Sequence, residues 1–194
     1  GYSGSGNLPC SLGRDPREPY PCTTYGANTS WYAIQADTNG TLYIGTDGSN
    51  FDTFVAPYEG RGNSFATLTN VACDNNSGVD GFDSRINFPA TMGATYFVQI
   101  QGVGAASGIA AINYKLVRPL SITNIVYTNG FGGQFTMRVN STSNLLTRVQ
   151  YSTNFASTNW ITLTNYTPVS GTFMFTNSNV GSSTNRYYRA LNVF

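Results

Sequence analysis

The chain is a succession of short apolar runs separated by small polar residues. The runs are rich in β-branched and aromatic residues with approximate alternation, and each closes at Gly, Asn, Asp or Pro. Turn sequences such as Asn39-Gly40, Asp47-Gly48 and Asn76-Ser77-Gly78 recur at intervals of about ten residues, the rhythm of an antiparallel sandwich. We find no convincing amphipathic helix. The pattern predicts an all-β protein.

The expected strands form two groups on either side of Arg118-Pro119. Proline ends one strand and stiffens the entry to the next segment, so we place a domain boundary there. The first group comprises residues 29–35, 40–45, 54–58, 67–73, 85–88, 95–101 and 110–117. The second group comprises residues 121–127, 134–140, 147–152, 160–165, 172–176 and 186–192.

These groups predict two consecutive antiparallel β-sandwich domains of the jelly-roll or immunoglobulin-like kind. They span residues 1–118 and 119–194, and the second is a small immunoglobulin-like or fibronectin-like sandwich. Alternation along its strands gives its candidate core faces. These are Phe135, Met137 and Val139, then Val149 and Tyr151, then Phe173 and Phe175.

Charge is sparse and unevenly distributed. Only 10% of the 194 residues are charged, and all nine acidic residues precede position 84. Separate bodies with opposite charge would steer copies of the chain into head-to-tail contact, while drift of a few charges is the alternative. Nucleic-acid binding is disfavoured, because the arginines beyond Pro119 are scattered and no lysine cluster accompanies them.

We expect the protein to be extracellular or at the cell surface. No stretch approaches the roughly 20 apolar residues that a membrane-spanning helix needs. The chain starts with Gly1 and has no charged-then-apolar leader, so we expect export by a signal peptide that has been removed.

Three cysteines leave the disulfide pairing open. Cys10 and Cys22 bracket a Pro-rich segment with little core of its own, and closing that loop would contribute about 3 kcal/mol in the chain-entropy model. We expect a Cys10–Cys22 disulfide that staples the N-terminal segment. Cys73 is then either a buried small side chain or a partner for one of the other two. The absence of histidine disfavours a zinc site.

Residues 18–118 resemble the bacterial pre-peptidase C-terminal domain, a secreted β-sandwich often appended to exported proteases. The resemblance rests on an ordered set of motifs, among which Pro57 replaces the usual aliphatic residue and suggests an edge strand or a bulge. The motifs are Glu18-Pro19, Thr29-Ser30-Trp31-Tyr32, Asn39-Gly40-Thr41-Leu42, residues 49–60 (SNFDTFVAPYEG), residues 71–78 (VACDNNSG), residues 84–88 (SRINF) and residues 94–102 (ATYFVQIQG).

The second domain is similar to a short all-β segment at the C-terminal end of many large secreted bacterial proteins. The matching stretches are residues 149–154 (VQYSTN), 159–163 (NWITL), 171–176 (GTFMFT) and 186–190 (RYYRA). This similarity implies a fold and an extracellular address. It implies no activity, because the family carries no single one.

Catalytic chemistry has few candidates. Without histidine, Ser-His-Asp and Cys-His systems are excluded, and we expect no enzyme activity and no cofactor. Asp74, Asp80 and Asp83 lie in a Gly- and Asn-rich loop, where they are expected to stabilise turns. A carboxylate pair of a glycoside hydrolase and a calcium site are the alternatives for the same loop.

Four aromatic residues are the candidate partner contacts: Trp31, Tyr58, Trp160 and Tyr187. Adjacent aromatic pairs such as Trp31-Tyr32 and Tyr187-Tyr188 point to opposite faces of a strand, so one member of each pair is available to a partner.

The leading hypothesis is a non-catalytic structural subunit or module that assembles head to tail into an extracellular filament or surface layer. Its partners would be further copies of the chain or other surface proteins. The alternative is an accessory module that binds a polysaccharide or a protein for a secreted hydrolase. Specific retention on a glycan, lost on replacing one exposed aromatic residue, would favour the alternative.

Overall fold

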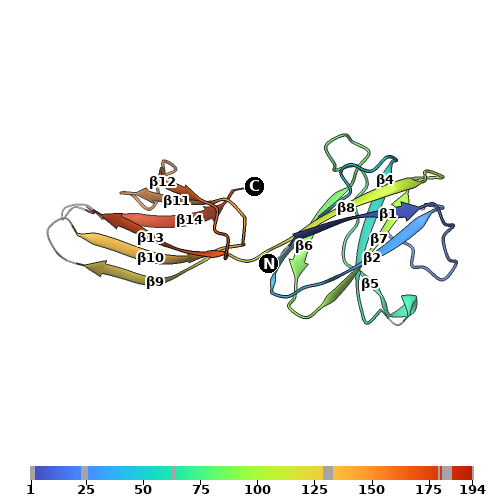
Figure 1. Ribbon diagram of the computed structural model, residues 1–194, viewed down its shortest axis with the longest axis horizontal. Helices are drawn as coiled ribbons and strands as arrows, with labels where there is room; N and C mark the ends of the chain where they lie inside the picture. The colour runs from blue at the N-terminus through green and yellow to red at the C-terminus, as the bar shows by residue number, and fades with distance from the viewer. Residues whose placement is uncertain are drawn as a thin grey trace. The chain divides into compact units, whose positions relative to one another are not determined.

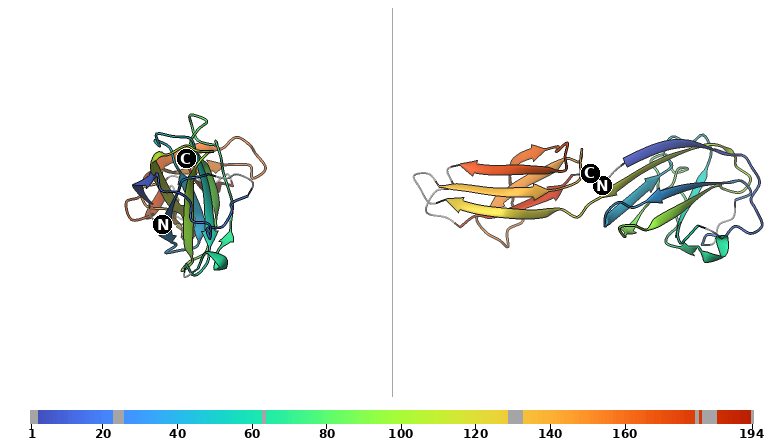
Figure 2. Two further views of the ribbon diagram at one scale, coloured as in Figure 1. Left: turned by 90° about the vertical axis from the view of Figure 1, so that its right-hand side faces the viewer. Right: turned by 60° about the horizontal axis from the view of Figure 1, so that its bottom comes forward.

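The structure is a computed structural model that describes residues 3–22, 26–62, 64–128, 133–178, 180 and 185–193. It divides into two compact units, Gly1–Val117 and Arg118–Phe194. The division falls one residue before the boundary that Arg118-Pro119 suggested. Figures 1 and 2 show the strands of each unit in two layers. The described residues contain no α-helix and therefore no helix long and apolar enough to cross a membrane.

The first unit is a sandwich of two four-stranded antiparallel sheets. One sheet has the order β1-β8-β3-β6 and the other the order β2-β7-β4-β5. The first sheet consists of β1 (Ser3–Cys10), β8 (Gly108–Val117), β3 (Gly40–Gly45) and β6 (Arg85–Ala90). The second consists of β2 (Thr29–Gln35), β7 (Thr95–Gly102), β4 (Thr53–Glu59) and β5 (Thr69–Asn70). A 3₁₀ turn, η1 (Phe65–Thr67), precedes β5.

The core of this unit lies between the two sheets. Alternate residues of each strand face inward, as period-2 patterning requires. Leu42 and Ile44 of β3 and Ile112 and Leu116 of β8 come from the first sheet, and all four are almost fully buried. From the second sheet, Val55, Tyr96, Val98 and Ile100 belong to the same cluster.

Strand β1 was not expected from the sequence. It has a single large apolar residue, Leu8, and alternates small residues in a Ser-Gly-Ser-Gly pattern of poor strand propensity. Nevertheless it pairs with β8 in continuous register from Ser3↔Lys115 to Cys10↔Gly108. Its edge position tolerates Pro9, which has no N–H to donate. Gly4 leaves room for the Tyr114 ring, which a β-carbon at that position would strike.

The disulfide joins Cys22 to Cys73, so the expected Cys10–Cys22 pairing is wrong. Cys10 is the last residue of β1 and turns into the core, where its thiol donates to the carbonyl oxygens of Asn28 (3.3 Å) and Ile100 (3.6 Å). Burial raises the pKa of the Cys10 thiol. The pairing of β1 with β8 places Cys10 inside the sandwich. Cys22 therefore forms its disulfide with Cys73.

The disulfide pins a cover over the outer face of the β2-β7-β4-β5 sheet. This cover, residues 11–22 and 26–28, buries a polar network on that face. Gln99 Nε2 donates to Glu18 Oε2 (3.1 Å), and Gln99 Oε1 accepts from Gln101 (3.0 Å) and from the Tyr58 hydroxyl (3.3 Å). Thr29 Oγ1 donates to Glu18 Oε1 (3.1 Å). Each of these buried polar side chains forms a hydrogen bond with another residue of the protein, as buried polar groups require.

The second unit is a smaller sandwich of two three-stranded antiparallel sheets. The orders are β13-β10-β9 and β12-β11-β14. The first consists of β13 (Thr172–Ser178), β10 (Gln134–Asn140) and β9 (Ser121–Thr128), and the second of β12 (Ile161–Tyr166), β11 (Thr147–Ser152) and β14 (Tyr187–Asn192). Its core is Met137, Val139, Val149 and Phe175. The chain is therefore all-β, with two consecutive antiparallel sandwiches, as predicted.

Candidate binding surfaces

An apolar groove opens on the second unit. It has a volume of about 430 Å³ and is formed by strands β9, β10 and β14 with the loop that precedes β12. Two of the four aromatic residues selected from the sequence, Trp160 and Tyr187, line it. The other lining residues are Ile122, Ile125, Phe135, Met137, Phe155, Arg186, Tyr188 and Arg189.

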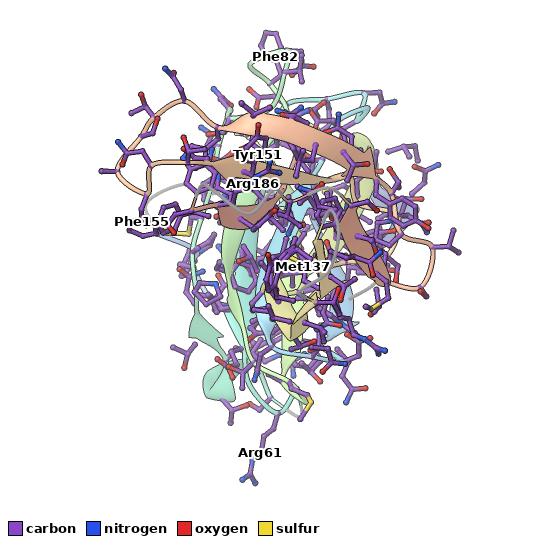
Figure 3. The ribbon with its side chains drawn as sticks, turned by 90° about the vertical axis from the view of Figure 1, so that its left-hand side faces the viewer. Arg61, Phe82, Met137, Tyr151, Phe155 and Arg186 are labelled. Carbon is purple, nitrogen blue, oxygen red and sulfur yellow. A yellow bond between two sulfur atoms is a disulfide. The ribbon has the colours of Figure 1, made fainter. Side chains whose placement is uncertain are left out.

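Two arginines give this groove its charge. Arg189 lies over the Trp160 ring at 4.2 Å and donates from Nε to Gln150 Oε1 at 2.9 Å. Arg186 lies over the Tyr151 ring at 5.1 Å, and its buried Nε has no hydrogen-bond partner among the described residues. Figure 3 shows Arg186 beside Tyr151. No acidic residue occurs anywhere after Asp83, so the groove is cationic as well as apolar.

The groove continues onto an exposed sheet edge. Strand β9 pairs with β10 on one side, and its other edge has no partner strand among the described residues. Ile125, Val126 and Tyr127 of β9 are all more than half exposed. A long apolar edge is a ready template for a further chain, and here it carries none of the lysines that usually block such pairing.

The acidic loop of the first unit presents apolar side chains of its own. Val79 and Phe82 are 79% and 60% exposed. Figure 3 shows Phe82 at the tip of its loop, directed away from the ribbon. Between them, Asp80 accepts hydrogen bonds from the backbone N–H groups of Asp83 and Phe82, which lower the pKa of its carboxyl. Asp80 is therefore a fixed, exposed negative charge between two exposed apolar groups.

The three aspartates selected from the sequence serve the turns of this loop. Asp74 accepts from Ser77 and from the backbone N–H of Arg85 (2.8 Å). Asp83 is buried and accepts from the N–H of Gly48 (2.9 Å). Burial, with the charges of Asp80 and Asp47, raises the pKa of Asp83. Among the described residues no three His, Cys, Asp or Glu side chains gather as a metal site would need.

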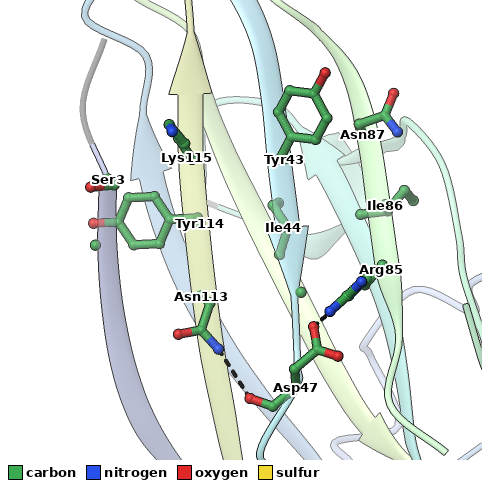
Figure 4. Close-up of a pocket in the computed structure, with 12 residues that line it drawn as sticks. Ser3, Tyr43, Ile44, Asp47, Arg85, Ile86, Asn87, Asn113, Tyr114 and Lys115 are labelled. Atoms are coloured by element: carbon green, nitrogen blue, oxygen red, sulfur yellow. Dashed lines mark hydrogen bonds and ion pairs between the residues drawn. The ribbon is translucent and has the colours of Figure 1, made fainter. Parts of the chain in front are cut away.

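A shallow hollow lies on the outer face of the β1-β8-β3-β6 sheet of the first unit. It has a volume of about 560 Å³ (Figure 4). Its floor is Gly45, which has no side chain, and its wall is the half-buried ring of Tyr43. Arg85 and Asp47 border it as an ion pair of 2.6 Å, and Asn113 Nδ2 donates to the Asp47 carbonyl at 3.1 Å. Burial raises the pKa of Asp47, but the hydrogen bonds from Arg85 and from the Val79 N–H, together with the charge of Arg85, outweigh it and lower the pKa of this carboxyl.

The four aromatic residues selected from the sequence have different environments in the structure. Tyr58 is 1% exposed, and the expectation that it contacts a partner is wrong, because the cover over its sheet buries it. Trp31 lies between Tyr58 and Phe65 at ring distances of 5.5 and 5.3 Å and borders an open pocket of about 620 Å³. Trp160 and Tyr187 both line the groove of the second unit, where the Tyr187 ring packs against the Phe155 ring at 5.5 Å.

Sequence reasoning missed Tyr43, Arg85 and Lys115 as a group. They lie on three strands far apart in the sequence, and only the strand order brings them together. Alternation could have shown that each points away from the core. It could not have shown that they face the same hollow.

Comparisons with known proteins identify no family. No protein-family model matches the chain, and no curated protein matches it. One solved structure aligned with it is a crystal structure of a GH2 beta-galacturonidase from Eisenbergiella tayi bound to glycerol. The alignment covers 93% of this chain and 37% of that one, with 10% identity and a TM-score of 0.33. Likeness at this level carries no argument about function, and the chain spans little more than a third of that structure.

Proposed function

We propose that the chain is a non-catalytic structural module of an extracellular assembly, in which the second unit of one copy holds the first unit of the next. The separation of charge between the units carries the proposal. The first unit has nine acidic and five basic residues, a net charge of −4, and the second has five arginines and no acid, a net charge of +5. Opposite fields steer unlike units together and keep like units apart.

The groove and the acidic loop have complementary chemistry. The groove offers an apolar floor with Arg186 and Arg189 at its edge. The loop offers Phe82 and Val79 on either side of the ionised Asp80. An aromatic anchor in an apolar pocket, beside a charge-assisted hydrogen bond, is the usual centre of a protein interface. A contact between two different surfaces does not close on itself, so it builds an open chain of subunits.

The non-catalytic and extracellular parts of the proposal have separate support. The chain has no histidine, and the carboxylates of its acidic loop are engaged by backbone N–H groups. The Cys22–Cys73 disulfide suits an oxidising compartment outside the cytosol. We include in this proposal the resemblance of residues 18–118 to the pre-peptidase C-terminal domain, because that domain is a secreted β-sandwich.

Sedimentation velocity over a range of concentrations tests the assembly. We expect oligomers at low salt that dissociate as salt is raised, because the steering charges are exposed. Arg186→Gln combined with Arg189→Gln is expected to abolish them, whereas Arg138→Gln, an exposed arginine outside the groove, should have little effect. A strict monomer at every concentration and salt level would overturn the proposal.

Mixing two defective variants gives the sharper test. A groove variant (Arg186→Gln with Arg189→Gln) keeps its loop, and a loop variant (Asp80→Asn with Phe82→Ser) keeps its groove. Each alone should remain monomeric, and a mixture should stop at the dimer because one functional surface of each kind remains. Oligomers that persist in both variants would show that other surfaces carry the contact.

A further inference from the structure

A row of polar and aromatic side chains crosses the hollow of the first unit in register. Ser3 of β1 pairs with Lys115 of β8, Lys115 pairs with Tyr43 of β3, and Tyr43 pairs with Asn87 of β6. Adjacent strands are about 4.8 Å apart, so these four residues span about 14 Å in a straight line across the sheet. Figure 4 shows these four residues on neighbouring strands of the sheet.

The neighbouring row of paired residues leaves space at the centre of the hollow. Asn113 of β8 and Arg85 of β6 both pair with Gly45 of β3, which contributes no side chain between them. A β-carbon at position 45 would lie 3.0 Å from Asp47 Oδ2, so any larger residue would intrude on the space that the Asp47–Arg85 pair borders. The glycine therefore leaves a hollow beside the Tyr43 ring, with hydrogen-bonding groups on both sides.

Charge at the hollow favours an anion. Asp47 and Arg85 neutralise each other at 2.6 Å. Lys115 forms no ion pair with the acidic side chains of the described residues, so its ammonium remains as the uncompensated charge of the row. An ammonium beside planar amides and an aromatic ring suits a ligand that has a carboxylate or sulfate, several hydroxyls and a flat apolar face.

We propose that this hollow binds an acidic saccharide. A sugar ring packs against Tyr43 over Gly45, its hydroxyls exchange hydrogen bonds with Asn87 and Asn113, and its anionic group is held by Lys115. All of these residues lie on strands β3, β6 and β8, and Asp47, which borders the hollow, lies two residues after the end of β3. The site is therefore formed before the ligand arrives, and little conformational entropy is lost on binding.

This site is separate from the residues of the proposed assembly, although Asp47 at its border accepts a hydrogen bond from the Val79 N–H of the acidic loop at 3.2 Å. It lies entirely on the β1-β8-β3-β6 sheet and its flanking turn, and it shares no residue with the groove or with Val79, Asp80 and Phe82. Binding of a saccharide by a monomeric variant would separate the two proposals. The groove variant, Arg186→Gln with Arg189→Gln, serves as that monomeric background.

Retention of the full chain on immobilised alginate, chondroitin sulfate and neutral dextran tests the inference. We expect retention on the two anionic polymers, little on dextran, and a loss of retention as NaCl rises from about 0.05 to 0.5 M. Lys115→Gln and Tyr43→Ala should each weaken binding about tenfold or more. Tyr43→Phe should retain most of it, because the ring remains.

Matched controls keep the test interpretable. Arg61→Gln removes an exposed cation and Tyr20→Ala an exposed tyrosine from the same unit, and neither residue borders the hollow. Unchanged thermal unfolding would show that the Tyr43 and Lys115 variants are folded. The inference fails if no polymer retains the chain, if dextran retains it equally, or if the controls lose binding as much as the hollow variants.

Discussion

The guanidinium of Arg189 lies over the indole of Trp160, with its Cζ atom 4.2 Å from the ring centroid. Arg189 is on β14 and Trp160 directly precedes β12, and β11 lies between those two strands. The contact therefore crosses the outer face of a three-stranded sheet. Gln150 of β11 fixes the arginine by accepting from its Nε at 2.9 Å.

Replacing the indole should destabilise the second unit. Trp160→Ala removes the ring beneath Arg189 and the 2.9 Å hydrogen bond from Nε1 to the Ser157 carbonyl. We expect the free energy of unfolding of this unit to fall by about 1–2 kcal/mol. Urea unfolding at low protein concentration measures it. Met174→Ala, which truncates an exposed side chain of the same unit, should change it by much less.

Reduction of the disulfide should destabilise the first unit. Cys22 and Cys73 are 51 residues apart, and closing a loop of this length contributes about 4 kcal/mol in the chain-entropy model. Thermal unfolding of Cys73→Ser, compared with the native chain, checks this value. Alkylation of the folded native chain should modify none of the cysteines, because Cys10 is buried and the other two are bonded. Rapid labelling of Cys73 in the native chain would contradict the pairing.

Tyr58 gives stability a dependence on alkaline pH. Burial raises the pKa of its hydroxyl to about 12, while an unfolded tyrosine titrates near 10. Since the folded state holds the proton more tightly, this contribution is complete below about pH 10 and is lost as the pH rises toward 12. Unfolding between these values should show a steeper loss of stability for the native chain than for Tyr58→Phe. Parallel curves for the two proteins would refute the assignment.

Asp83 makes the stability of the first unit depend on pH in the acidic range. Burial raises the pKa of its carboxyl, so its ionisation opposes folding. The protonated form favours the native state below the ordinary pKa of aspartate, and this contribution is lost as the pH rises through the raised value. Asp83→Asn should therefore gain stability relative to the native chain from acid to neutral pH. Asp47→Asn should lose stability over the same interval, because hydrogen bonds from Arg85 and Val79 and the charge of Arg85 together outweigh burial and lower the pKa of Asp47. A difference that does not vary with pH would contradict both assignments.

Strand positions could be predicted where β-branched and aromatic residues alternate. Residues 29–35, 40–45, 134–140 and 147–152 are strands with the expected bounds. The prediction was wrong for 67–73, where only Thr69–Asn70 forms a strand. After Asn70 the chain stops pairing with β4 and pairs with it again only at the isolated Val55↔Asp74 bridge. Pro57 lies on β4, an interior strand that pairs with β7 in continuous register and with β5 on its other side, so the edge strand or bulge expected at this residue was wrong.

The candidate surfaces were less accessible to sequence reasoning. Trp160 and Tyr187 could be selected as aromatic residues on strand ends, but nothing local distinguished them from Tyr58. The burial of Tyr58 depends on the cover, residues 11–22 and 26–28, whose path over the sheet is set by the hydrogen bond between Glu18 and Gln99 and by the disulfide. Such contacts join distant parts of the chain, and periodicity reports only on neighbours.

The covalent ring closed by Cys22 and Cys73 contains β2, β3, β4 and β5, so one bond encircles strands from both layers of the sandwich. Arg61 is exposed within that ring. A protease that cuts after Arg61 would leave two pieces still tied together by sulfur, and they would migrate as one species until a reductant was added. The module can thus be nicked in a protease-rich environment without shedding either half.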